Sequence, residues 1–115
     1  MPQKIYIISC AETSFLKIGV ANDVNKRLSQ LQGGCPFVLS VEYSTKKTKD
    51  DIARQVESRA HYILKDSHER GEWFDIELCD AISAIIKAKK QVLNKRACYT
   101  YKPRMKMTTN LGWKY

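Results

Sequence analysis

The stretch FLKIGVANDVNKRLSQL, residues 15–31, decides the fold that the sequence predicts. Its first part has the alternation of a strand and breaks at Gly19. Its second part begins with a capping residue, Asn22 or Asp23, and continues with an apolar stripe at helical spacing. The stripe consists of Val24, Leu28 and Leu31. Arg27 lies beside it, where its guanidinium reaches either solvent or a pocket.

The neighbouring segments complete a small α/β pattern. The β-branched run at 4–10 precedes the strand at 15–20 by a short turn, which makes the two strands antiparallel. The alternating segment at 37–43 predicts a third strand. Two more helices are predicted at about 51–65 and 80–95. We therefore expect an α/β fold with a three-stranded antiparallel sheet flanked by about three helices.

Apolar side chains mark the faces expected to be buried. Segment 67–76 is predicted to be a loop that buries Trp73 and Phe74. The third strand is expected to place Phe37, Leu39, Val41 and Tyr43 on one face. The stripe of the second helix is Ile52, Val56, Ala60 and Ile63, and that of the third is Ile82, Ile85, Ile86, Val92 and Leu93.

Charge divides the chain into two unequal parts. Residues 1–80 contain 11 Lys or Arg against 12 Asp or Glu, whereas residues 81–115 contain 9 Lys or Arg and no acid. A basic C-terminal third indicates a polyanionic partner, most often nucleic acid. The alternative is a solvated, lysine-rich helix and tail.

Cysteine spacing and hydropathy exclude several classes of protein. The four cysteines form no C-x-x-C pair, so no zinc site is predicted. There is no signal-peptide pattern and no apolar run of membrane-spanning length. We expect a soluble cytoplasmic domain with reduced cysteines and no membrane partner.

Four polar residues border the predicted core. Glu57 and His61 lie one turn apart on the margin of the second helix, Tyr6 lies in the first strand, and Arg27 lies on the first helix. A carboxylate binds a hydrated divalent cation, and a guanidinium pairs with phosphate oxygens. A phenol or an imidazole transfers a proton if its pKa is suitable. Each residue alone is equally typical of an ordinary surface or core position.

The motifs KIYIIS, KIGVANDVNKRLSQLQGGCP, ARQVESRAHYIL and RGEWFDI, in this order, resemble the GIY-YIG nuclease superfamily. The likeness covers residues 5–76 and is closest to a short branch of phages and bacteria whose second tripeptide often reads K-I-G. Tyr6 matches the tyrosine of the first tripeptide, and Gly19 matches the last glycine of the second. Arg27 matches the arginine of the family's helix, and Glu57 matches its metal-binding glutamate.

The resemblance implies a metal-dependent DNA endonuclease. Glu57 would bind Mg²⁺ or Mn²⁺, Arg27 would hold the phosphate, and Tyr6, aided by His61, would act as general base. Glu72 lies either near the site or at the surface, and the surface is the expectation. A homodimer is expected if both DNA strands are cut.

Two departures from the family pattern keep alternatives open. Lys4 replaces the first glycine, and Lys17 replaces the tyrosine of the second tripeptide. Lys17 either contacts the phosphate as a point charge or marks a catalytically degenerate, DNA-binding module. A third interpretation is a protein-interaction or inhibitor domain that uses the basic surface.

The C-terminal segment mixes cations with aromatic rings. We expect a nuclease domain at residues 1–96 and a tail at 97–115. Such a mixture suits a phosphate backbone and unstacked bases, and the alternative is a strap that packs on its own domain. The cations predicted to bind nucleic acid, besides Lys17 and Arg27, are Lys95, Arg96, Lys102, Arg104 and Lys106.

Overall fold

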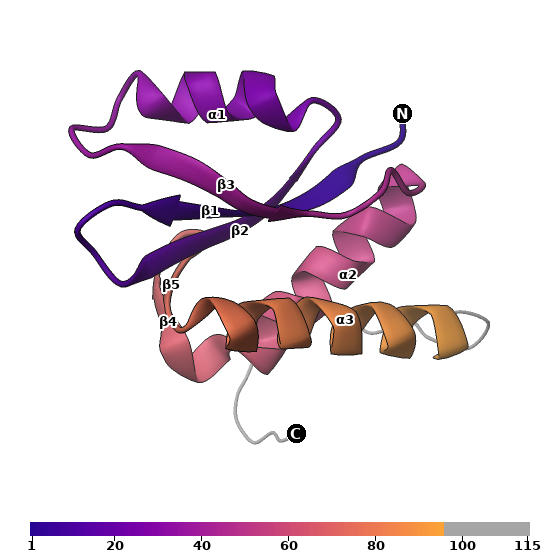
Figure 1. The fold of residues 1–115 in the computed structure, drawn as a ribbon. Helices are drawn as coiled ribbons and strands as arrows, with labels where there is room; N and C mark the ends of the chain where they lie inside the picture. The colour runs from indigo at the N-terminus through magenta and orange to yellow at the C-terminus, as the bar shows by residue number, and fades with distance from the viewer. Residues whose placement is uncertain (96–115) are drawn as a thin grey trace.

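Five antiparallel strands form the sheet, in the order β3-β1-β2-β5-β4 (Figure 1). The computed structural model describes residues 1–95. The strands are β1 (Lys4–Cys10), β2 (Phe15–Ala21), β3 (Leu39–Ser44), β4 (His68–Arg70) and β5 (Trp73–Asp75). The α/β class and the antiparallel sheet are confirmed, but the prediction of three strands is wrong. The two additional strands have three residues each, too few to show an alternating pattern.

Three helices pack on the two faces of the sheet. They are α1 (Val24–Gln32), α2 (Asp50–Ile63) and α3 (Leu78–Lys95), with a single 3₁₀ turn, η1 (Lys65–Ser67), after α2. Figure 1 shows α1 on one side of the sheet and α2 with α3 on the other. Asp23 caps α1 as predicted, because its carboxylate accepts a bond of 3.0 Å from the Lys26 N–H. Within residues 1–95, no helix combines the length and the apolarity needed to cross a membrane.

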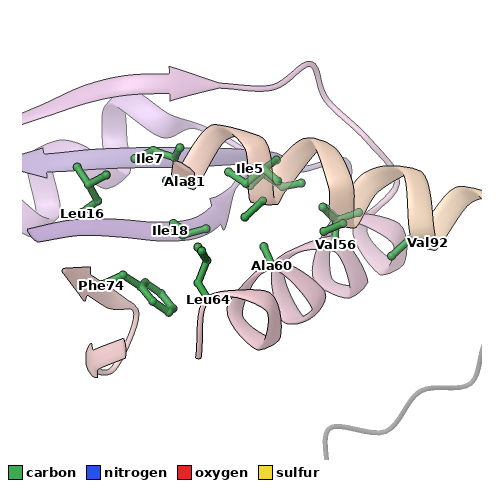
Figure 2. Packing of buried hydrophobic residues seen from close by; sticks show 14 residues of the cluster. Ile5, Ile7, Leu16, Ile18, Val56, Ala60, Leu64, Phe74, Ala81 and Val92 are labelled. Carbon is green, nitrogen blue, oxygen red and sulfur yellow. The ribbon is translucent and has the colours of Figure 1, made fainter. Parts of the chain in front are cut away.

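The sheet separates two hydrophobic clusters. The larger one lies between the sheet and helices α2 and α3 (Figure 2). It includes Ile5, Ile7, Leu16, Ile18, Val56, Ala60, Phe74, Ile85 and Val92. The smaller one lies under α1 and consists of Tyr6, Ile8, Cys10, Val24 and Leu39. Because side chains alternate along β1, Tyr6 points toward the face that α1 covers.

Some positions predicted to be buried are exposed. β3 begins at Leu39, so Phe37 lies before the strand and is exposed. On α3, Ile86 and Leu93 are exposed, because the sheet and α2 cover only part of the helix circumference. The segment predicted as a loop contains the β4–β5 hairpin, and of its two aromatic residues only Phe74 is fully buried.

Two adjacent isoleucines on α3 provide a test of this packing. Ile85 is 1 % exposed and Ile86 is 48 % exposed. We expect Ile85→Ala to lower the free energy of unfolding by about 2–5 kcal/mol, because it leaves a cavity in the larger cluster. Ile86→Ala should change it by only about 0.5 kcal/mol. Urea unfolding followed by circular dichroism measures both, and equal losses would contradict the observed orientation of α3.

Candidate active site

Ile18 marks the point where two parts of the chain meet the outer edge of β2. The strand β5 pairs with β2 only at residues 15–17. Beyond this point the Ile18 N–H donates to the Glu72 carbonyl at 3.1 Å. The Ile18 carbonyl accepts a hydrogen bond of 2.9 Å from His61 Nε2. The β4–β5 turn and helix α2 are therefore both fixed at one residue of β2.

Tyr6 lies across Gly19 on the neighbouring strand. A Cβ atom at position 19 would lie 2.6 Å from the Tyr6 hydroxyl oxygen and 2.9 Å from Glu72 Oε1. The Tyr6 hydroxyl and the Glu72 carboxylate thus occupy the space over residue 19. Only glycine, which has no side chain, leaves this space open. Burial raises the pKa of Tyr6, and a hydrogen bond with Arg27 opposes this rise.

Lys17 is buried, with 7 % of its surface exposed. Its Nζ atom lies 2.9 Å from Glu72 Oε1 and 5.7 Å from the centroid of the Trp73 ring. Burial alone would raise the pKa of Glu72, but the Lys17 ammonium outweighs it and lowers this pKa. The expectation that Glu72 lies at the surface is therefore only partly met, because its side chain is 40 % exposed but pairs with Lys17 in the site. The β4–β5 turn brings its half-buried carboxylate onto Lys17.

Glu57 points from α2 into the same region. Its side chain is 15 % exposed, and its Oε2 atom has no hydrogen-bond partner among residues 1–95. Burial and the nearby carboxylate of Glu72 raise the pKa of Glu57 to about 7. A buried carboxyl group with an unsatisfied oxygen favours either a proton or a cation at this position.

His61 holds α2 against β2. Its Nε2 atom carries the proton, because the Ile18 carbonyl only accepts, and this nitrogen lies 4.0 Å from Glu57 Oε2. Burial lowers the pKa of His61, which keeps the imidazole neutral near pH 7. The ring also packs edge-on against Phe74, with centroids 4.9 Å apart. These contacts position the helix, and the role of His61 in proton transfer stays a prediction.

The structure brings most of the predicted site residues together. Arg27 extends from α1, where it contacts Gln30 at 3.4 Å and acts on the Tyr6 hydroxyl. Tyr6, Lys17, Arg27, Glu57 and His61 therefore border one region around Gly19. Of the predicted basic residues, Lys95 is the last residue of α3. The others lie outside the described residues: Arg96, Lys102, Arg104 and Lys106.

The donor set suits a hard, hydrated cation. Among the residues that the structure describes, no group of three or more His, Cys, Asp or Glu side chains could hold a metal. Two carboxyl groups, those of Glu57 and Glu72, do act on each other. Mg²⁺ keeps several water ligands and is commonly bound by one or two carboxylates together with substrate phosphates. The unsatisfied Glu57 oxygen fits this mode of binding.

Glu72 is the site residue for which the sequence favoured the surface over the site. It interacts with Lys17 and Glu57, which are 55 and 15 residues away in the chain. The available signal was the glycine before it and the aromatic pair after it, GEWF, which is typical of a turn leading into a buried strand. Gly71 indeed has φ = 58°, and this turn directs Glu72 toward β2.

The fold and the site define a small α/β domain in which two carboxyl groups, a lysine, an arginine and a tyrosine surround a glycine at a sheet edge. Comparison with family models gives one match, to the T5orf172 domain, over residues 3–90. The chain belongs to this family, whose domain is found in endonuclease-like proteins of phages and bacteria. No curated protein and no solved structure matches the chain.

Replacing Gly19 tests the crowding over β2. We expect Gly19→Ala to destabilise the protein by about 1–3 kcal/mol, because the new methyl group would overlap the Tyr6 ring and the Glu72 carboxylate. Gly34→Ala is the matched control, since a Cβ there meets nothing within 4 Å. Chemical denaturation of both variants gives the answer. A Gly19→Ala protein as stable as the control would place Tyr6 elsewhere.

The pKa of Glu57 leads to a second prediction, on the pH dependence of stability. At pH 5–7 without divalent metal, the folded protein keeps a proton on Glu57 that the unfolded chain has largely released. The free energy of unfolding of the wild type minus that of Glu57→Gln should therefore fall as the pH rises from about 4.5 to about 7. The difference between the two proteins is the proper measure, because the lowered pKa of His61 gives the opposite slope below about pH 6.5. Urea unfolding in EDTA at several pH values measures it, and a constant difference would contradict the raised pKa.

Proposed function

We propose that this domain is a divalent-metal-dependent DNA endonuclease of the GIY-YIG type. The observation that carries the proposal is the meeting of two carboxyl groups, Glu57 and Glu72, with the Lys17 ammonium close to the Tyr6 hydroxyl, on which Arg27 acts. Carboxylates suit a cation, and guanidinium and ammonium groups suit a phosphate. Membership of the T5orf172 family supports a nuclease or DNA-binding role at the coarser level.

Arg27 and Lys17 would bind the phosphate that is cut. Arg27 offers a planar set of donors for two non-bridging oxygens. Lys17, a buried residue of β2, offers a point charge at the position where the GIY-YIG family often has a tyrosine. When a phosphate accepts from Lys17, Glu72 loses its partner and its carboxylate becomes available to a cation.

Glu57 and Glu72 would hold Mg²⁺ or Mn²⁺. Such an ion stabilises the negative charge that develops on the phosphate and on the leaving oxygen. The chain's own contribution is to place two carboxyl oxygens in a half-buried region, where the attraction for a cation is stronger than in bulk water.

Tyr6 would orient the attacking water. The raised pKa keeps the Tyr6 phenol protonated at neutral pH, while its oxygen accepts the hydrogen bond from Arg27. Accepting the proton of the water requires a lower pKa, and Arg27 acts in that direction. Tyr6 is therefore proposed as the general base only when positive charge lies beside it.

A second candidate function is a DNA-binding module that does not cut. It is favoured by the short Lys17–Glu72 ion pair, which already neutralises one carboxylate without a metal. Incubation of plasmid, nicked, branched and single-stranded DNA with Mg²⁺ or Mn²⁺ distinguishes the two. A cytoplasmic location and a homodimer stay predictions.

The central test is Glu57→Gln. It keeps the size of the side chain, so α2 should pack as before, but it removes the charge that would hold the cation. We expect single-turnover cleavage to fall by about a thousandfold or more, while DNA affinity in Ca²⁺ stays equal or rises slightly. Arg27→Ala should lose both cleavage and affinity, because its guanidinium contacts the phosphate directly.

The matched control is Glu77→Gln, which removes an exposed glutamate outside the site. It should cleave like the wild type. If Glu57→Gln also cleaves like the wild type, the metal assignment is wrong. If the wild type binds DNA but cleaves none of the four substrates with either metal, the DNA-binding module takes the place of the endonuclease.

A further inference from the structure

A pocket of about 450 Å³ lies next to the candidate site. It is lined by Cys10, Phe15, Cys35, Glu69, Arg70 and Trp73. Its volume is within the range of small-molecule sites. Trp73 connects the two places, because the same ring that lines the pocket has the Lys17 ammonium 5.7 Å from its centroid.

The walls of the pocket suit a flat, apolar group. Phe15 and Trp73 are both half-buried, and both line the pocket. The two thiols, Cys10 and Cys35, add small and weakly polar surface. Aromatic side chains of this kind bind nucleobases by stacking, with little dependence on sequence.

The rim supplies one acceptor and one donor group. Glu69 and Arg70 are exposed on β4 and line the pocket together. A carboxylate accepts hydrogen bonds from the amino groups of bases and repels phosphate, whereas a guanidinium donates to ring nitrogens and carbonyl oxygens. This combination favours an uncharged, planar ligand with a polar edge, which describes a nucleobase.

We propose that this pocket binds one unpaired base of the DNA, next to the phosphate that contacts Lys17. The inference rests on the proposed function, since it takes Lys17 as a phosphate contact. A base inside a duplex is stacked and paired, so only a base outside the stack can enter such a pocket. The substrate class is therefore DNA with a bulged, flipped or single-stranded nucleotide at the cleavage site.

The test compares three labelled duplexes of the same sequence, in Ca²⁺ to allow binding without cleavage. One is fully paired, one carries a single-base bulge, and one carries an abasic residue in place of the bulged base. Fluorescence anisotropy gives the three affinities. We expect the bulged duplex to bind about tenfold more tightly than the other two, as the loss of one stacked base predicts.

Two cysteine variants show whether the preference comes from this pocket. Cys35→Phe fills the pocket from the loop after α1, where the hydrogen bonds of residue 35 are made by its backbone N–H and carbonyl with Gln32. Cys79→Phe places the same bulk at an exposed cysteine of α3 and serves as the control. The first variant should lose the tenfold preference and keep its affinity for paired DNA, and the second should keep both.

A spectroscopic measurement checks the contact independently of affinity. In a Trp113→Phe protein, Trp73 is the only tryptophan left. The bulged duplex should quench its fluorescence more than the abasic duplex does. Equal affinity for all three duplexes, equal quenching, or a preference that survives in Cys35→Phe would each overturn the pocket assignment while the proposed function stands. No binding to any duplex would refute the proposed function and the pocket with it.

Discussion

The hydrogen bond from His61 to the Ile18 carbonyl holds the candidate site together. β5 is too short to cover the outer edge of β2, so the backbone of Ile18 would otherwise lack partners inside the protein. The Glu72 carbonyl accepts a hydrogen bond from the Ile18 N–H, and His61 Nε2 donates one to the Ile18 carbonyl. Glu57 lies one turn before His61 on α2, and the Glu72 side chain extends from the turn that pairs with Ile18. Two hydrogen bonds to the backbone of Ile18 thus determine where both carboxyl groups lie.

Local sequence signals were enough for the long elements and failed for the short ones. The strand at 4–10 and the helix capped by Asp23 follow from alternation and capping, which act over a few residues. β4 and β5 exist because β2 offers an edge to pair with, which no local pattern reveals. Ile85 and Ile86 both belong to the apolar stripe predicted for the third helix, yet Ile86 is exposed. Burial depends on which neighbours cover the helix, and spacing alone does not show this.

The candidate site likewise contains residues that sequence motifs predict and one residue whose place depends on tertiary contacts. Tyr6, Arg27 and Glu57 were predicted from motifs in this sequence, and the structure places them around Gly19. Glu72 could not be predicted in this way, because its contacts depend on the hairpin that sequence reasoning missed. The pairing of Glu72 with Lys17 also changes how that lysine is interpreted. A buried ammonium 2.9 Å from a carboxylate is a satisfied charge, so Lys17 has a partner within the protein besides the phosphate proposed for it.

The charges of the site bear on the two ligands of opposite sign that are proposed for it. Burial and the repulsion from Glu72 hold the pKa of Glu57 at about 7, and the Lys17 ammonium neutralises only one of the two carboxyl groups. A cation alone would compete with Lys17 for Glu72, and a phosphate alone would meet two nearby carboxyl groups. If the site binds both ligands as proposed, Lys17 and Arg27 would turn to the phosphate while the carboxyl groups would turn to the cation, so each ligand would remove the repulsion that opposes the other. Binding of the two ligands is therefore expected to be mutually favourable, which is the coupling that linkage requires when two ligands stabilise the same arrangement of side chains.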